Sequence, residues 1–378
     1  MSEQQPHWIW RQPDWPTFTW QDQRLAGLLR EIYPLQGQLL GSVQGIASQE
    51  SLQSEMEALL QNAMNTSAIE GERLDMDSVR SSLAQRLGLD RAGLPPGTPQ
   101  TDGLADLLLD ATHNYRDVLT VQRLHQWHRA LFPVGQSGLT PIRVGELRGE
   151  APMQVVSGPI GRPMVHFEAP PREGLEAELD AFMLWFNASR ADTTLDPLLR
   201  AGIAHLWFVT LHPFDDGNGR IARVITDLAL AQAEHHSVRF YAMATTIMAH
   251  REAYYRVLER TQRNGLDLTD WLEWFLIMLR QTLNHALDRI QQVLLKARFW
   301  QQHRQVILNE RQNKVINRLL DAGVGGFEGG MNARKYRGLT QASKATATRD
   351  LTDLLEKGLL KKCSGAGRST RYEIAWPT

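Results

Sequence analysis

The stretch TLHPFDDGNGRIARV, residues 210–224, decides how the rest of this 378-residue chain is interpreted. It brings one histidine, two aspartates, two glycines and two arginines together within fifteen positions. Apolar runs flank it, AGIAHLWFVTL before and IARVITDLALAQA after, and both have the spacing of a helix. The sequence therefore predicts two apolar helices joined by a short polar turn, and that turn is the candidate for chemistry.

The turn has the features of an anion site. The first helix ends near His212, and the second begins near Gly219, where free backbone N–H groups and the positive end of the helix dipole gather. Arg220 and Arg223 are three positions apart on the opening turns of the second helix and project toward one side of it. Two guanidinium groups suit two phosphates better than one, so the predicted ligand is a polyphosphate.

Two further residues supply what phosphoryl chemistry needs. Asp216 offers an oxygen ligand of the kind that Mg²⁺ prefers beside a polyphosphate. The turn holds no activated Ser, Cys or Lys, but His212 can take a proton from a hydroxyl group that a second substrate brings in. Base, metal ligand, anion cradle and phosphate clamp together predict nucleotidyl transfer.

The run HPFDDGNGRIAR, residues 212–223, resembles the motif of the Fic domain at every defined position. The resemblance implies a helical core that transfers AMP from ATP, with Mg²⁺, to a Ser, Thr or Tyr hydroxyl of a target protein, and the chain itself is one candidate target. It implies a general base at His212, a metal ligand at Asp216, an anion hole at Gly217, Asn218 and Gly219, and contacts to the outer phosphates at Arg220 and Arg223. By the same likeness Phe214 anchors the turn in the core, and Asp215 fills a variable position without a catalytic role.

A hairpin is predicted just upstream of the motif. In MQVVSGPIGRPMVHFEAPP, residues 153–171, two β-rich runs flank Gly and Pro, and a double proline ends the second run. The hairpin resembles the family's flap, which aligns a target backbone by strand addition, with docking expected at Val155, Val156, Ser157 and Gly158. The alternative is plain scaffolding. Downstream, the resemblance implies nucleoside contacts at Tyr254 and Tyr255, completed by Gln262 or Asn264.

The segment TSAIEG, residues 66–71, places Thr66 and Glu70 one helical turn apart and so on one face of a helix that Gly71 ends. By composition alone it is simply a helix end. It resembles the inhibitory pattern of Fic proteins, which implies that Glu70 pairs with Arg223 and forces ATP into a pose unsuited to in-line attack. In some relatives the same glutamate helps to remove AMP from the target, so removal of AMP is an alternative direction.

The chain's end is basic. Residues 311–378 hold 13 Lys and Arg against 6 Asp and Glu, a balance of +7, and leave 28 against 36 upstream, within a total charge of −1. The order of helix, glycine-rich break, short basic segment NARKYRG, helix and two strands predicts a winged helix-turn-helix. Lys344, Thr346 and Arg349 lie in the N-terminal half of its second helix and are the expected DNA contacts; a dimerisation or protein-interaction domain is the alternative.

The whole chain is predicted to be mainly α, with a Fic-type core, one small hairpin flap and a C-terminal winged helix-turn-helix. The expected domains are residues 1–103, which include the inhibitory helix, 104–309 and 310–378. The sequence offers neither a signal peptide nor a run of about 20 apolar residues, and its single cysteine, Cys363, fits a reducing cytoplasm. The expected partners are ATP and a target protein, with DNA and a second copy of the chain as further candidates.

Three functions compete for this chain. The leading one is an auto-inhibited protein adenylyltransferase. Its rivals are a Fic-type enzyme that removes AMP or transfers another phosphate-containing group, and a DNA-binding regulator that senses nucleotide. His125 and His128 share a helix face, but two imidazoles without a third ligand are expected to be structural rather than a metal site.

Overall fold

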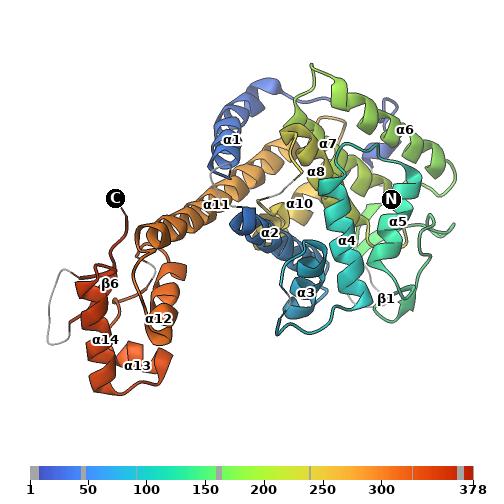
Figure 1. Ribbon diagram of the computed structural model, residues 1–378. Coiled ribbons are helices and arrows are strands. Elements are labelled where there is room, and N and C mark those ends of the chain that lie inside the picture. The colour runs from blue at the N-terminus through green and yellow to red at the C-terminus, as the bar shows by residue number, and fades with distance from the viewer. Residues whose placement is uncertain are drawn as a thin grey trace. The chain divides into compact units, whose positions relative to one another are not determined.

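The computed structural model describes residues 8–43, 48–90, 92–158, 164–237, 240–325, 327–363 and 370–377 of the chain (Figure 1). The fold is mainly α, as the sequence predicts. The chain forms two compact units, one of Met1–Gly41 with Ala47–Ala286 and one of Ser42–Ile46 with Leu287–Thr378. Among the described residues, no helix combines the length and the apolar character needed to cross a membrane.

Among its described residues, the first unit contains two short 3-10 helices and most of the α-helices. Its elements are η1 (Ile9–Arg11), α1 (Asp22–Val43), α2 (Ser48–Ile69), α3 (Met76–Arg86), α4 (Pro99–His113), α5 (Val121–Leu131), α6 (Leu175–Ala188), η2 (Ser189–Ala191), α7 (Pro197–Leu211), α8 (Asn218–Glu234), α9 (Met243–Ala249), α10 (Arg251–Gln262) and the first part of α11 (Thr269–Gln302). The boundary expected at residue 103 does not separate two units, because α2 and α3 pack on each other and on α4.

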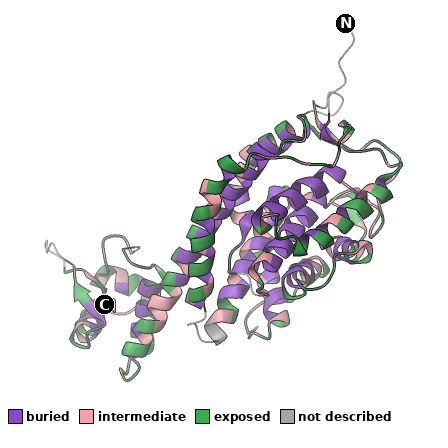
Figure 2. Cartoon of the chain, turned by 90° about the horizontal axis from the view of Figure 1, so that it is seen from above, coloured by how far each residue is buried: buried purple, intermediate pink, exposed green. Residues whose placement is uncertain are grey.

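Helices α7 and α8 form the centre of this unit. Every residue from Leu198 to Leu211 is buried, because α7 is apolar around its whole circumference and neighbours cover all of its faces. The two helices pack along each other; α6 covers α7, and α2, α4 and α5 lie against α8 (Figure 1). Figure 2 shows the buried residues concentrated on these inner helices. The polar turn that joins α7 to α8 is therefore held by the best-packed part of the molecule.

Two stretches differ from what their sequence predicts. The glycine- and proline-rich residues 93–103 predict a loop throughout, but α4 begins at Pro99, because Thr98 and Thr101 form a capping box and a proline is favourable at the first helical position. The apolar spacing of residues 104–132 predicts continuous helix, but these residues are divided between α4 and α5. Thr120 starts α5 by accepting a hydrogen bond from the Arg123 N–H.

The predicted hairpin is present as β3 (Gln154–Ser157) and β4 (Met164–Glu168), which pair antiparallel with a register shift between Val155 and Val156. Residues 159–163, at its tip, lie outside the described residues. The N-terminal aromatic segment supports the hairpin, since Trp8 packs edge-on against Phe167 at 5.4 Å. A second, smaller hairpin of β1 (Gln136–Ser137) and β2 (Thr140–Pro141) was not predicted.

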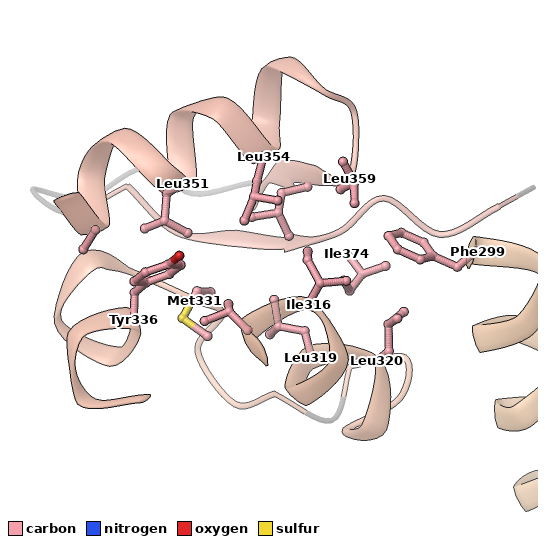
Figure 3. Close-up of a cluster of buried hydrophobic side chains, with 13 residues drawn as sticks. Phe299, Ile316, Leu319, Leu320, Met331, Tyr336, Leu351, Leu354, Leu359 and Ile374 are labelled. Atoms are coloured by element: carbon pink, nitrogen blue, oxygen red, sulfur yellow. The ribbon is translucent and has the colours of Figure 1, made fainter. Parts of the chain in front are cut away.

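The second unit has its own apolar core. It contains the end of α11, α12 (Glu310–Asp321), α13 (Ala333–Thr340), α14 (Lys344–Glu356), and the antiparallel strands β5 (Leu360–Lys362) and β6 (Tyr372–Ile374). Side chains of α12, α14 and β6 converge in Figure 3, among them Ile316, Leu319, Leu351, Leu354 and Ile374. Phe299 of α11 belongs to this core, so the unit begins before the boundary expected at residue 310.

The segment NARKYRG, expected as a short basic segment, is most of helix α13. Asn332 caps it by accepting a hydrogen bond from the Lys335 N–H at 2.9 Å. Tyr336 is buried, and its hydroxyl donates to Asp350 of α14 at 2.8 Å. This helix was hard to predict from the sequence because most of its side chains are polar or basic. Only Tyr336 is buried, so the apolar spacing of a helix is missing.

Candidate active site

His212 directly follows α7 as its C-cap residue, in a left-handed backbone conformation with a φ of 49°. Such a conformation is uncommon for a residue with a side chain and is held by its surroundings. Arg148 is buried beside the turn and donates from Nε to the His212 carbonyl at 2.9 Å and from Nη2 to the Pro170 carbonyl at 2.5 Å. Pro170 follows β4, so one arginine ties the base of the hairpin to the His212 turn.

The imidazole of His212 is set up to accept a proton at Nε2. Its Nδ1 lies 3.1 Å from the Val209 carbonyl, which can only accept, so Nδ1 carries the proton of the neutral ring. Burial lowers the pKa of His212 and the Arg148 cation lowers it further, although the Val209 carbonyl and the carboxylates of Glu70 and Asp216 oppose this. The ring is therefore neutral at physiological pH.

The turn after His212 is fixed by Asn218 and Phe214. The Asn218 amide accepts from the Phe214 N–H at 2.9 Å and donates to the Phe214 carbonyl at 2.8 Å. Phe214 is fully buried and stacks on His128 at 4.3 Å, which is the anchor that the sequence predicted. His128 also links the Gly145 N–H to the Asp216 carbonyl and is structural. The side chain of Asn218 thus shapes the turn, and only its backbone is left to contact an anion.

Glycines at the start of α8 give the anion cradle its shape. Gly217 has a φ of 80°, which favours glycine. The N–H groups of Asn218 and Gly219 lie in the first turn of α8, where no helical acceptor exists for them. A Cβ at position 219 would collide with the Glu70 carboxylate and lie 3.3 Å from Arg223 Nη1. Glu70 and Arg223 therefore meet directly over the cradle.

The two arginines of α8 are both buried, and both are paired with acids from residues 70–72. Arg223 donates from Nη2 to Glu70 Oε1 at 2.6 Å and from Nε to Thr66 Oγ1 at 2.7 Å. Arg220 donates from Nη1 to Glu72 Oε2 at 2.8 Å. Within the described residues, Arg220 Nε and Arg223 Nη1 have no hydrogen-bond partner. Buried unpaired donors of this kind fit an anionic ligand.

The pair of Glu70 and Arg223 is the contact that the resemblance implied. Burial alone would lower the pKa of Arg223, but the nearby Glu70 carboxylate outweighs it and raises that pKa. Tyr255 donates to Glu70 Oε2 at 3.3 Å, and Arg251 Nε donates to the Ile69 carbonyl at 2.6 Å. Helix α10 thus holds the end of α2, and Gly71, two residues beyond that end, has a φ of 82°.

Asp216 lies beside the cradle with its carboxylate partly exposed. One oxygen contacts the Ser137 hydroxyl and lies 4.0 Å from Arg220 Nη2, and the other accepts from the Gly217 N–H. Among the described residues no group of three or more His, Cys, Asp or Glu forms a metal site. Mg²⁺ usually takes one or two carboxylates together with phosphate oxygens and water, so a single exposed Asp216 fits a magnesium ion that arrives with a nucleotide.

The structure corrects the expected nucleoside contacts. Tyr254 is buried, and its hydroxyl bonds to His205 Nε2 at 2.8 Å, so its ring offers no surface to a nucleoside. Gln262 is also buried and donates to Thr210 Oγ1 at 3.1 Å. Tyr255 and Asn264 keep exposed surface. The pairing of Tyr254 with a buried histidine 49 residues earlier left no mark in the sequence.

The hairpin of β3 and β4 is anchored to α10 through β4. His166 Nδ1 lies 2.9 Å from Glu259 Oε2, and Arg263 Nη2 donates to the Val165 carbonyl at 2.7 Å. Within the part of the chain that the structure describes, β3 pairs only with β4, and Val156 is exposed. The residues expected to dock a target, Val155 to Gly158, therefore belong to a segment whose other edge is unpaired among the described residues.

Sequence reasoning missed three residues at this site. Arg148 and Ser137 belong to segments without a recognisable pattern and reach the motif only through the fold. Glu72 had a signal, since it follows directly on the Glu-Gly of the inhibitory segment, but an acid after a helix end is common on protein surfaces. A second signal was the presence of two arginines at the start of α8, since two buried cations call for two acidic partners.

Comparisons with known proteins agree with this geometry. The sequence profile of the Fic/DOC family matches residues 118–230, and that of a domain of unknown function (DUF4172) matches residues 8–89. The protein named "Protein adenylyltransferase Fic" of Aedes aegypti is 27% identical over 209 residues, which are 54% of this chain and 38% of that protein. Its namesake in Drosophila melanogaster is 25% identical over 252 residues, 63% of this chain and 48% of that protein. The chain thus spans between about two fifths and one half of these relatives.

Solved structures show the same fold. A Fic family protein from Desulfovibrio desulfuricans G20 aligns with a TM-score of 0.51 and 20% identity, over 93% of this chain and 95% of that one. A Fic domain containing signaling protein from Bacteroides thetaiotaomicron VPI-5482 aligns with a TM-score of 0.52 and 18% identity, over 69% of this chain and 97% of that one. The chain therefore contains a Fic domain, which spans residues 118–230.

Proposed function

We propose that this protein transfers AMP from ATP to a Ser, Thr or Tyr hydroxyl of a target protein, and that Glu70 keeps the resting site slow. The single observation that carries the proposal is Arg223, a buried cation that Glu70 holds from the turn after α2 and that, among the described residues, still has an unpaired N–H over the anion cradle. A site built only for stability would pair all of its buried donors.

His212 is the general base in this proposal. Its neutral ring leaves Nε2 free to take the proton of a target hydroxyl, because Nδ1 is engaged by the Val209 carbonyl. The hydroxyl oxygen then forms a bond to the α-phosphorus of ATP, the bond from that phosphorus to the bridging oxygen breaks, and pyrophosphate leaves. Arg220, Arg223 and the first N–H groups of α8 bind the negative charge of the phosphates.

A magnesium ion would supply charge neutralisation at the phosphates, with Asp216 as its protein ligand. The exposed edge of β3 is suited to hold a target segment by strand addition. The names of the relatives support adenylyl transfer.

Glu70 accounts for inhibition through charge and position. Its carboxylate occupies Arg223 and lies against Gly219, where a phosphate oxygen would otherwise sit. A carboxylate there repels the outer phosphates of ATP and displaces the α-phosphorus from the line of attack. ATP binding and AMP transfer are therefore both expected to improve when the carboxylate is removed.

Labelled ATP tests the proposal and separates it from its enzymatic rivals. Glu70→Gln keeps the shape of the side chain and removes its charge, and the acceptor is the chain itself. We expect label from the α-phosphate to enter the variant protein faster than the wild type. Label from the γ-phosphate should not enter.

Three outcomes would each contradict part of this proposal. Entry of γ-label would indicate transfer of a phosphoryl group instead. Loss of α-label during a chase with unlabelled ATP, faster in the wild type than in Glu70→Gln, would indicate removal of AMP. Equal α-label in both proteins would exclude Glu70 as the brake. Glu57→Gln, which lies on α2 and pairs with Arg80 away from the site, is the matched control.

We propose as a second function that the second unit is a winged helix-turn-helix that binds duplex DNA through α14. The observation in its favour is the exposed start of this helix. Lys344 and Arg349 are exposed and, within the described residues, form no ion pair, while Leu351 and Leu354 hold the opposite face in the core. Helix α14 follows α13 after a three-residue turn, an order typical of DNA-reading helix pairs.

A further inference from the structure

We infer that Glu72 is a second inhibitory carboxylate, which occupies Arg220 while Glu70 occupies Arg223, so that one turn of the chain blocks both phosphate-binding arginines. The inference rests on the proposed function, because it concerns the regulation of the same nucleotide site. It assigns a role to a residue outside the inhibitory pattern that the sequence revealed.

The contact of Glu72 with Arg220 is specific. Glu72 Oε2 accepts from Arg220 Nη1 at 2.8 Å, and the side chain of Arg220 is only 6% exposed. The other oxygen, Oε1, accepts from Gln100 at the start of α4. Because both oxygens are engaged, the carboxylate is fixed in direction rather than left to sample solvent.

A contact with an aromatic ring also fixes the position of Arg220. Its guanidinium lies over the ring of Phe132, 4.8 Å from the centroid, and its Nε is buried without a partner among the described residues. The aromatic face and the surrounding protein limit where the guanidinium can point. Glu72 therefore competes for the N–H groups that an outer phosphate would need.

The backbone explains how two acids so close in sequence reach two different arginines. Helix α2 ends at Ile69, and the N–H groups of Glu70 and Glu72 both donate to the Ser67 carbonyl, at 3.1 Å and 3.0 Å. Gly71 between them has a φ of 82°, which reverses the chain direction. The two side chains thus leave the turn toward arginines three positions apart on α8.

The two contacts are expected to act on different parts of ATP binding. Each carboxylate adds one negative charge, which neutralises one guanidinium group of the phosphate clamp. AMP lacks the outer phosphates, so its binding should depend little on Glu72. The ratio of ATP affinity to AMP affinity therefore measures the effect of the carboxylates on the outer phosphates, because contacts to the nucleoside contribute to both affinities and cancel.

Nucleotide binding measured by calorimetry tests the inference. The background is His212→Ala, which prevents turnover, and the variants added to it are Glu72→Gln, Glu70→Gln, both together, and Gln100→Leu. We expect Glu72→Gln to tighten ATP binding by up to about tenfold and to leave AMP binding unchanged. Gln100→Leu should tighten ATP binding by a smaller factor, because it releases Glu72 without removing it.

The outcomes separate this inference from the proposed function. Tighter ATP binding in Glu72→Gln, multiplied by the effect of Glu70→Gln in the double variant, supports two inhibitory carboxylates. Unchanged or weaker ATP binding in Glu72→Gln, beside tighter binding in Glu70→Gln, overturns the role of Glu72 and leaves the proposed function standing. Absence of ATP binding in every variant overturns both. Glu57→Gln, with an unchanged melting temperature, controls for charge on α2.

Discussion

At the scale of single residues, the site depends on a histidine in an unusual backbone conformation. His212 ends α7 with a positive φ, and Arg148 holds its carbonyl while Val209 fixes its tautomer. His212 lies at the end of α7, Arg148 in a loop and Val209 within α7. They make one imidazole nitrogen available without any nearby carboxylate in hydrogen-bond contact with the ring among the described residues.

The rate of AMP transfer should depend on pH through His212. Burial lowers the pKa of its imidazole below the ordinary value of 6.5, and the protonated ring cannot act as a base. In Glu70→Gln, we expect a rate of α-label incorporation that is level from pH 8 to about pH 7 and declines only below about pH 6.5. Tryptophan fluorescence at each pH checks that the chain stays folded. A half-maximal rate above pH 7 would contradict the assignment of His212 as a base with a lowered pKa.

Much of this site could be predicted from residues 212–223, because there the sequence spacing alone brings a base, a carboxylate, glycines and arginines together. The pairing of Glu70 with Arg223 was expected only from the resemblance of residues 66–71 to the Fic inhibitory pattern, because by composition that segment is simply a helix end. Tyr254 was misjudged because neighbouring tyrosines on a helix face different sides, and only the fold shows that one of them meets His205. Arg148 and Glu72 act across more than 60 residues of sequence, a separation that no local pattern records.

At the scale of elements, helix α10 holds the end of α2 and the turn that follows it, which contains Glu70. Arg251 donates to the last carbonyl of α2, and Tyr255 donates to both that carbonyl and Glu70. Since the final carbonyls of a helix have no helical donors, these contacts fix the end of α2. The proposed brake would therefore depend on the packing of two helices as well as on one ion pair.

Arg251→Ala should loosen the end of α2 and release part of the inhibition. With Glu70 intact, we expect AMP incorporation to rise by about fivefold, less than in Glu70→Gln, because one hydrogen bond contributes about 1 kcal/mol. Labelled ATP measures the effect. Arg256→Ala, an exposed arginine on the same helix, is the matched control. Equal incorporation in both variants would show that α10 does not hold the brake.

The sequence predicted the long apolar helices well, since periodicity decides them. It failed at α4 and α13. In α4 the proline that suggested a loop is the first residue of the helix, and Thr98 caps it. In α13 a run of basic residues concealed the single buried Tyr336. Both errors concern helix starts, where capping by one side chain decides the structure and apolar spacing carries little information.

At the scale of the whole molecule, the chain combines a Fic-domain unit with a smaller helical unit that has a separate core. The positive balance of +7 lies in the residues after 310, and the arginines of the nucleotide site lie in the other unit. The two proposed functions therefore use different surfaces and can be tested independently.

DNA binding by the second unit is expected to weaken in Lys344→Ala and Arg349→Ala. Each variant should reduce the slope of log affinity against log salt by about one, because each removes one cation that neutralises a DNA phosphate. Gel shifts on duplex DNA over a range of salt measure this. Lys296→Ala, which removes a cation already paired with Asp321 at 2.6 Å, is the control. Equal slopes in all proteins would contradict DNA binding through α14.

The central claim is that His212 passes AMP to a hydroxyl once Glu70 no longer occupies Arg223. Intact-mass spectrometry tests it most directly, on Glu70→Gly and on Glu70→Gly with His212→Ala, each after incubation with ATP and Mg²⁺. The account predicts protein carrying added AMP for the single variant and none for the double variant. Unmodified protein in both samples, or equal addition of AMP in both, would contradict it.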